Sequence, residues 1–452
     1  MRLRISTFIL LAAGSVALAQ AQTGALAAAG MLDGSFGGGT GLVTTLFNPA
    51  SPINTDYAFD LVVQPDGKLV VAGWASDISD PADFALARYN PDGSLDSSFG
   101  GTGLVRAGFG SFSIEEGFAL LREPNGKLVV GGWAASSPLD PSVDFVLMRF
   151  LPNGQPDPAF GTGGKVKTNL GADDWVLVLA RAADGKLLAG GRSGPVGSHN
   201  FALARFLPNG ALDTTFGTAG KVVTDFSGRD DSIEALVVLP DGRILAAGPS
   251  GTGPTGGPFK MALARYTKLG KPDPTFGTSG KTLLSFGQSS AATALALLAG
   301  GKFLVGGGIA MSGGVGGAAN MDFAVLRFNS NGKLDPTFGT AGRVTTDFAH
   351  KFDGVDDLRV LGNGKIVVAG QIDESHPGAG DGAMGLARYS ANGQLDSTFG
   401  TAGRVRTHFP GSVGSSVEAM EIQANGRIVV VGPVFPAFPA IGVSFGVARY
   451  LN

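Results

Sequence analysis

Three short elements recur seven times in the same order, at spacings of 56 to 63 residues. The first is a turn around Gly-Lys or Gly-Arg that leads into an apolar run, as in PDGKLVVAG (65–73). The second is an apolar segment ending in Arg-Tyr or Arg-Phe, as in FALARY (84–89), and the third has the form LDSSFG (95–100). A fixed period of this kind is typical of repeat architectures, in which each unit packs against its neighbours.

The pattern within each unit predicts strands only. Apolar runs flank a Gly-containing turn on both sides, which indicates two hairpins per unit and hence four strands, the fourth including the LDxxFG element. Four strands in about sixty residues are typical of a β-propeller blade, and no unit contains an amphipathic helix pair. The sequence therefore predicts an all-β fold, a seven-bladed β-propeller with four strands per blade.

The two ends of the repeat region complement each other. The first element is LDGSFG (32–37), with no Arg-Tyr segment before it, and the chain ends on FGVARYLN (445–452), with no LDxxFG element after it. We expect the N-terminal strand to complete the last blade and so to close the ring, which leaves no exposed strand edge. Residues 32–452 are then one propeller domain, preceded by a short linker over residues 22–31.

An Arg in each Arg-Tyr/Phe segment precedes an Asp of the LDxxFG element by eight residues. Counting back from the turn between them places the two charges opposite each other across a hairpin, where an ion pair is favourable. We interpret these charges as structural pairs rather than as an anion site. The predicted pairs are Arg88–Asp96, Arg149–Asp157, Arg205–Asp213, Arg265–Asp273, Arg327–Asp335, Arg388–Asp396 and, between the two ends, Arg449–Asp33.

The first 21 residues have the features of a secretory signal peptide. Arg2 and Arg4 precede an apolar run, and small residues at a possible cleavage site follow it. We therefore expect an exported protein, periplasmic or extracellular, with no membrane span. The formal net charge of −3 gives no indication of nucleic-acid binding.

The run PDGKLVVAG…FALARYNPDGSLDSSFG resembles the bacterial delta-60 repeat, a tandem unit of about sixty residues that is found in exported proteins. The resemblance covers residues 32–452. It implies a propeller architecture and export, and it implies no activity and no catalytic residues.

Binding is expected on the face that carries the connections between the second and third strands, because only these connections vary in length and composition. Three tryptophans and two phenylalanines could form an aromatic surface there for a protein or carbohydrate ligand, or could cover the ends of the blades: Trp74, Trp133, Trp175, Phe435 and Phe438. We expect a monomeric binding or interaction scaffold.

An acidic residue stands eleven positions before the turn Gly in five of the seven units: Asp56, Glu115, Asp174, Asp231 and Asp353. A ring of carboxylates at the mouth of the central channel could hold calcium, which binds six to eight oxygen ligands. Alternatively, each carboxylate caps the turn before its strand. The alternative function is accordingly a calcium-dependent hydrolase or lactonase at the channel mouth. We expect no enzyme, because no catalytic motif lies in the required context: GVSFG (442–446), for example, leads into a strand rather than a helix.

Overall fold

The structure is a computed structural model that describes residues 28–78, 80–110, 113–135, 143–251, 258–311, 320–348, 352–373, 382–437 and 442–452. The predicted signal peptide and residues 22–27 of the predicted linker lie outside these ranges.

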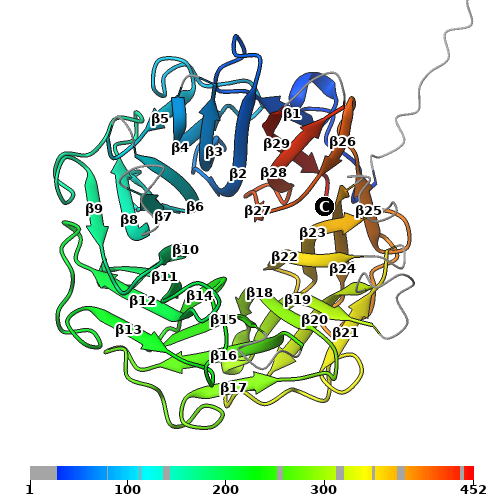
Figure 1. The fold of residues 1–452 in the computed structure, drawn as a ribbon. Helices are drawn as coiled ribbons and strands as arrows, with labels where there is room; N and C mark the ends of the chain where they lie inside the picture. The colour runs from blue at the N-terminus through cyan, green and yellow to red at the C-terminus, as the bar shows by residue number, and fades with distance from the viewer. Residues whose placement is uncertain are drawn as a thin grey trace, which may run out of the picture.

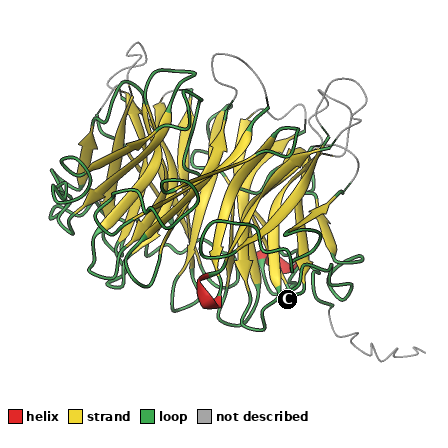
Figure 2. Ribbon diagram, turned by 90° about the horizontal axis from the view of Figure 1, so that it is seen from below, coloured by secondary structure: helices red, strands yellow, loops and turns green. Residues whose placement is uncertain are grey.

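Almost every element of the described chain is a β-strand. The exceptions are two 3-10 helices, η1 (Gly37–Gly39) and η2 (Ala299–Gly301). The sheets stand around a central opening (Figure 1), and their strands run between two faces that carry the loops (Figure 2). No helix among the described residues has the length and apolar character needed to cross a membrane. The all-β prediction is confirmed.

Five sheets have four strands each, and each comes from one continuous stretch of chain. In order from the central opening outward they are β6 (Ile114–Arg122), β7 (Leu128–Ala135), β8 (Val143–Phe150) and β9 (Lys165–Thr168); β10 (Asp174–Arg181), β11 (Leu187–Ser193), β12 (Asn200–Phe206) and β13 (Lys221–Thr224); β14 (Ala235–Val238), β15 (Ile244–Ser250), β16 (Lys260–Tyr266) and β17 (Lys281–Leu284); β18 (Ser290–Leu297), β19 (Phe303–Ala310), β20 (Met321–Phe328) and β21 (Arg343–Thr346); β22 (Asp353–Val360), β23 (Ile366–Asp373), β24 (Gly382–Tyr389) and β25 (Arg404–Thr407).

The sixth sheet has nine strands and contains both ends of the repeat region. Its strands are β1 (Leu42–Thr45), β2 (Asn54–Val63), β3 (Leu69–Asp77), β4 (Asp80–Tyr89), β5 (Leu104–Ala107), β26 (Ser412–Ser415), β27 (Ala419–Ile422), β28 (Ile428–Pro436) and β29 (Gly442–Tyr450). Within it, β1 pairs antiparallel with β29, from Leu42 opposite Ala448 to Thr45 opposite Phe445.

The prediction of seven separate four-stranded blades in a closed ring is wrong. The seven sequence repeats give six sheets, and none of the sheets in the described chain closes on itself. The reason is a short parallel contact between β2 and β29, in which Asn54 lies opposite Gly442 and Thr55 opposite Val443. This contact merges the strands of the first and last repeats into one sheet, which a count of repeats could not reveal.

Gly442 makes the contact between β2 and β29 possible. Its φ is 128°, which L side chains rarely adopt, and a Cβ there would lie 2.1 Å from the Asn54 carbonyl oxygen. Gly442→Ala is therefore expected to lower the free energy of unfolding by about 1–3 kcal/mol and to speed amide hydrogen exchange at Thr55. The matched control is Gly362→Ala, where a Cβ meets open space. Equal effects of the two substitutions would contradict this account.

The LDxxFG element is a turn rather than part of the fourth strand. The hairpin register is as predicted, with the Asn90 amide bonded to the Ser94 carbonyl and Tyr89 bridged to Leu95. The chain then turns, because Asp96 Oδ1 accepts hydrogen bonds from the amide (3.1 Å) and the hydroxyl (2.7 Å) of Ser98. The fourth strand starts only at Leu104 and is four residues long.

In all seven predicted pairs, the Arg and the Asp lie opposite each other. The Nε–Oδ2 distances are 2.7–2.8 Å in every unit, including Arg449–Asp33. Each Asp also contacts the Lys or Arg that follows the first turn of its unit, such as Lys68 Nζ at 2.8 Å from Asp96. In five of the seven pairs both partners are buried, with Asp96 6% and Arg88 7% exposed for example, and Arg327 and Asp396 of the other two pairs are partly buried.

Each of these arginines also joins neighbouring units. The guanidinium lies 4.5–4.9 Å above the ring of the Phe in its own LDxxFG element. In six of the seven units an outer nitrogen donates to a backbone carbonyl of the next turn, as from Arg88 to Pro152 at 2.6 Å and from Arg449 to Pro91 at 2.5 Å. Arg388 donates instead to the Asn452 side chain at 2.7 Å. These arginines therefore link each unit to its neighbour.

Candidate ligand-binding site in the central channel

The innermost strands surround a cavity of about 1070 Å³. Its walls come from β2, β6, β10, β14, β18, β22 and β27, or from residues directly before them. The lining residues of β2 run from Phe59 toward the turn at Gln64 and Pro65. The cavity therefore lies in the part of the channel near the short uniform turns, and not on the face with the variable connections, where the sequence predicts binding.

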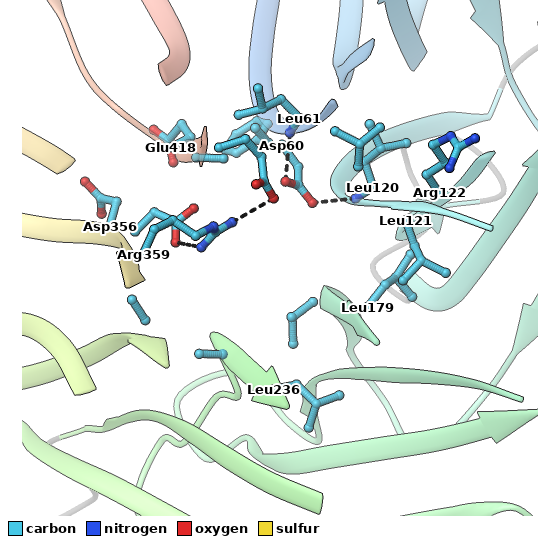
Figure 3. A pocket seen from close by; sticks show the side chains of 18 of the residues that line it. Asp60, Leu61, Leu120, Leu121, Arg122, Leu179, Leu236, Asp356, Arg359 and Glu418 are labelled. Atoms are coloured by element: carbon cyan, nitrogen blue, oxygen red, sulfur yellow. Dashed lines mark hydrogen bonds and ion pairs between the residues drawn. The ribbon is translucent and has the colours of Figure 1, made fainter. Parts of the chain in front are cut away.

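One position of the repeat determines the character of this channel. The residue eight places before the turn Gly lines the cavity in every unit. Around the opening these residues are Phe59, Phe118, Leu177, Glu234, Thr293, Asp356 and Glu418. One half of the channel is therefore aromatic and apolar, and the other half is polar and acidic. In Figure 3, Asp356, Arg359 and Glu418 lie on one side of the cavity and Leu120, Leu121 and Leu179 on the other.

Each of the three carboxyl groups at this position uses one oxygen in a local hydrogen bond. Glu234 Oε1 accepts a hydrogen bond from the Ser232 hydroxyl at 2.5 Å, and Glu418 Oε1 accepts one from the Ser416 hydroxyl at 3.2 Å. Asp356 Oδ2 accepts a hydrogen bond from the Gln371 backbone amide at 3.1 Å. Within the described chain, the second oxygen of each group accepts no hydrogen bond. These oxygens are available to a ligand.

Burial raises the pKa of the same three groups, and the charge of a neighbouring carboxylate adds to the effect for two of them. Burial raises the pKa of Glu418 to about 7, and the charge of Glu234 adds to the effect. Burial, followed by the charge of Glu418, raises the pKa of Asp356 well above its ordinary value. Burial also raises the pKa of Glu234. The charge of Glu234 thus acts on both Asp356 and Glu418, so the ionisation of this acidic region responds to charges placed within the cavity.

Four other charged residues of the channel, Asp60, Asp357, Arg359 and Glu421, are already paired. Asp60 Oδ2 accepts from the Leu120 amide at 2.7 Å, and Asp357 Oδ2 accepts from the Met420 amide at 2.9 Å, so each carboxyl bonds the next inner strand. Arg359 pairs with Asp357 and, at 3.1 Å, with Glu421. Burial raises the pKa of Asp60 to about 7. We interpret these residues as structural.

Four of the five predicted aromatic residues lie in one continuous arc of rings. Trp74 stacks on Tyr57 at 4.8 Å, and Phe435 contacts the same ring at 6.1 Å. Trp175 lies 5.6 Å from Trp133, and Arg192 lies 4.0 Å above the Trp175 ring. The fifth predicted residue, Phe438, lies outside the described residues.

Three residues that the sequence analysis did not select complete this aromatic arc. Tyr57 lies 6.0 Å from Phe59, Phe59 contacts Phe118 edge to face at 4.8 Å, and Phe118 stacks on Trp175 at 5.6 Å. The arc thus leads from the ends of β3, β7 and β28 into the channel, where Phe59 and Phe118 line the cavity. All its rings are half-buried, so it is neither core nor free surface.

The five predicted metal ligands do not form an open ring. All five are buried, with 0–1% of each residue exposed. One oxygen of each accepts a hydrogen bond from a backbone amide in the segment before its strand: Asp56 from Phe47, Glu115 from Phe109, Asp174 from Leu170, Asp231 from Phe226 and Asp353 from Phe348. This is the geometry of the capping alternative.

The chemistry of these five groups does not fit a shared ion. In each the second oxygen is buried without a hydrogen-bond partner. Burial raises the pKa to about 6 for Asp56 and Asp231 and to about 7 for Glu115 and Asp353, so the surroundings disfavour the charged form that a metal ligand requires. Among the described residues, no group of three or more His, Asp or Glu side chains could hold a metal ion.

A family model described as "Domain of unknown function (DUF5122) beta-propeller" matches the chain six times. The matched residues are 64–99, 123–160, 182–216, 239–276, 301–338 and 361–399. Each match runs from the first turn of a unit through its LDxxFG element. No curated protein matches the chain.

Solved structures with a similar arrangement of strands share little sequence with this chain. Polysaccharide lyase Uly1 is 11% identical, with 87% of this chain and 89% of that chain covered and a TM-score of 0.47. Sqt1 from Chaetomium thermophilum is 12% identical, with 91% and 100% covered and a TM-score of 0.45. Drosophila Plexin A, in complex with Semaphorin 1b, is 11% identical, with 88% and 87% covered and a TM-score of 0.41. Similarities at this level carry no conclusion about a ligand.

Proposed function

We propose, from the premise that the chain is built of β-propeller repeats, that it is an exported binding scaffold whose ligand occupies the central channel. Export rests on the signal-peptide features of residues 1–21, and the resemblance to delta-60 repeats agrees with it. The proposed location is the periplasm or the outside of the cell.

The observation that carries this proposal is the two-sided lining of the cavity. Ligand pockets are commonly about 300–1,000 Å³ in volume and mostly apolar, with a few polar groups that orient the ligand. The cavity of about 1070 Å³ is near the upper end of this range, with Phe59 and Phe118 on one side and carboxyls with available oxygens on the other. In addition, the buried indole N–H of Trp74, in the aromatic arc, has no hydrogen-bond partner within the described chain. An unpaired buried donor is costly unless a water or ligand accepts from it.

The alternative, a calcium-dependent hydrolase or lactonase, has less support. Such an enzyme needs three or four ligands that converge on one ion and leave one position open. The five acidic residues that could have supplied them are separated, and each caps its own turn.

Ligand binding in the channel is expected to change tryptophan fluorescence, because all three tryptophans lie in the aromatic arc. We would titrate the protein with neutral and acidic oligosaccharides, extended peptides and alkyl amines, and record emission and melting temperature. At least one class is expected to bind, and Phe118→Ala is expected to weaken its affinity about tenfold or more, since an aromatic anchor in a cavity contributes strongly to binding.

Two further variants make this experiment specific. Phe118→Leu keeps an apolar side chain of similar bulk and separates loss of binding from loss of folding. Phe259→Ala removes a 43% exposed ring outside the channel and is expected to leave affinity unchanged. Two results would contradict a ligand site in the channel. One is that Phe259→Ala abolishes binding while Phe118→Ala does not, and the other is that no class of compound binds.

A further inference from the structure

The channel has an excess of negative charge. Six carboxyl groups and two guanidinium groups line the cavity. Arg359 is engaged by Asp357 and Glu421, and Arg122 lies toward the turn that follows β6. At a pH at which these carboxyls are ionised, the lining therefore repels an anionic ligand and attracts a cationic one.

The apolar half of the channel suits the body of such a ligand. Phe59 and Phe118 contact each other edge to face, and Leu61, Leu120 and Leu179 extend the apolar wall. An aliphatic stem loses contact with water against this wall, which is favourable in proportion to the apolar area buried. Aromatic faces additionally attract cations, through the negative charge at the centre of the ring.

The acidic half suits the charged end of the ligand. Glu234, Asp356 and Glu418 occupy the same position of their repeats, so they lie at one level of the channel. Each offers an oxygen that no hydrogen bond of the described chain occupies. A protonated amine donates three hydrogen bonds and a guanidinium five, and both need acceptors arranged in this way.

We propose that the channel binds an organic cation, with its apolar stem against Phe59 and Phe118 and its amine or guanidinium group among Glu234, Asp356 and Glu418. This inference rests on the proposed function and names the chemical class of the ligand. Free diamines and the side chains of lysine or arginine in an extended peptide share this chemistry.

The test measures affinity by isothermal titration calorimetry at pH 8, where amines are protonated and Glu418, whose pKa burial raises to about 7, is ionised. The probes are 1,8-diaminooctane, an acetylated and amidated tetrapeptide containing one lysine, and 1-octanol, which has the stem without the charge. At least one cationic probe is expected to bind at least tenfold more tightly than 1-octanol. If only the diamine binds, the ligand is a free amine. If the peptide binds, the ligand is a cationic side chain of a peptide.

The paired variants Asp356→Asn and Glu418→Gln keep the shape of each side chain and remove its charge. Each is expected to weaken binding of the cationic probe at least fivefold without lowering the melting temperature. Asp66→Asn, at an exposed residue outside the cavity, is the matched control and is expected to change nothing. If neither cation binds more tightly than 1-octanol, or both variants bind like the wild type, the inference is wrong. Oligosaccharide binding that depends on Phe118 would then leave the proposed function standing.

Discussion

Asp33→Ala is expected to lower the free energy of unfolding by about 3–5 kcal/mol, because it leaves a buried arginine without its partner. Asp33 is 3% exposed and lies 2.8 Å from Arg449 Nε and in contact with Arg427. Burial alone would raise the pKa of Asp33, but hydrogen bonds from Ser35 and Arg427 and the charge of Arg449 lower it to about 2. The Asp33 carboxylate is therefore charged in the folded protein, and its ion pairs with Arg427 and Arg449 connect the first repeat to the last.

Chemical denaturation of the two proteins measures this loss, and amide hydrogen exchange locates it. Exchange is expected to accelerate in β1, which pairs with β29 next to Arg449. The matched control is Asp66→Ala, since Asp66 is exposed and only accepts the Lys68 amide at 3.2 Å. A change below about 1 kcal/mol for Asp33→Ala would show that the pair is only a surface contact.

Stability is expected to fall as the pH rises from about 4 to about 7. In the folded state, burial raises the pKa of Asp56 and Asp231 to about 6 and that of Glu115 and Asp353 to about 7. The folded chain then holds protons that the unfolded chain releases, so the stabilisation is complete below about pH 4 and is lost as the pH rises through these values. For Asp353, a rise in pKa from 3.8 to about 7 corresponds to about 4 kcal/mol.

Denaturation curves at pH 5 and pH 8 measure this dependence, and Asp353→Ser isolates one contribution. Serine occupies the equivalent position in two repeats, as Ser290 and Ser415, so the fold accommodates it there. The variant is expected to lose less stability between pH 5 and pH 8 than the wild type. Below about pH 4 the trend reverses, because aspartates such as Asp33 then lose their ion pairs. Equal stability of the wild type at the two pH values would contradict the account.

The sequence predicted those parts of the fold that every repeat shares. The register of the Arg–Asp hairpins follows from counting residues around a turn, and the distances agree with it in all seven units. The number of sheets could not be predicted in this way. It depends on a contact between Asn54 and Gly442, which lie far apart in sequence and belong to no repeated element.

The candidate site was missed for the opposite reason. Residues that recur in every repeat tend to have a structural role, and the recurring acidic residue Asp231 caps a turn. The channel owes its chemistry to a position at which the repeats differ, with Phe59 in the first unit and Glu418 in the last. The signal was present in the sequence, since this position lies eight residues before each turn Gly. However, only the structure shows that it faces the cavity.

The most direct test of a cation-binding channel is a crystal structure of the wild-type protein soaked with 1,8-diaminooctane at pH 8. The account predicts difference density for the diamine inside the channel, with one amine within hydrogen-bonding distance of Asp356 or Glu418 and the chain against Phe59 and Phe118. Density only among the variable connections, or an empty channel at a saturating concentration, would contradict it.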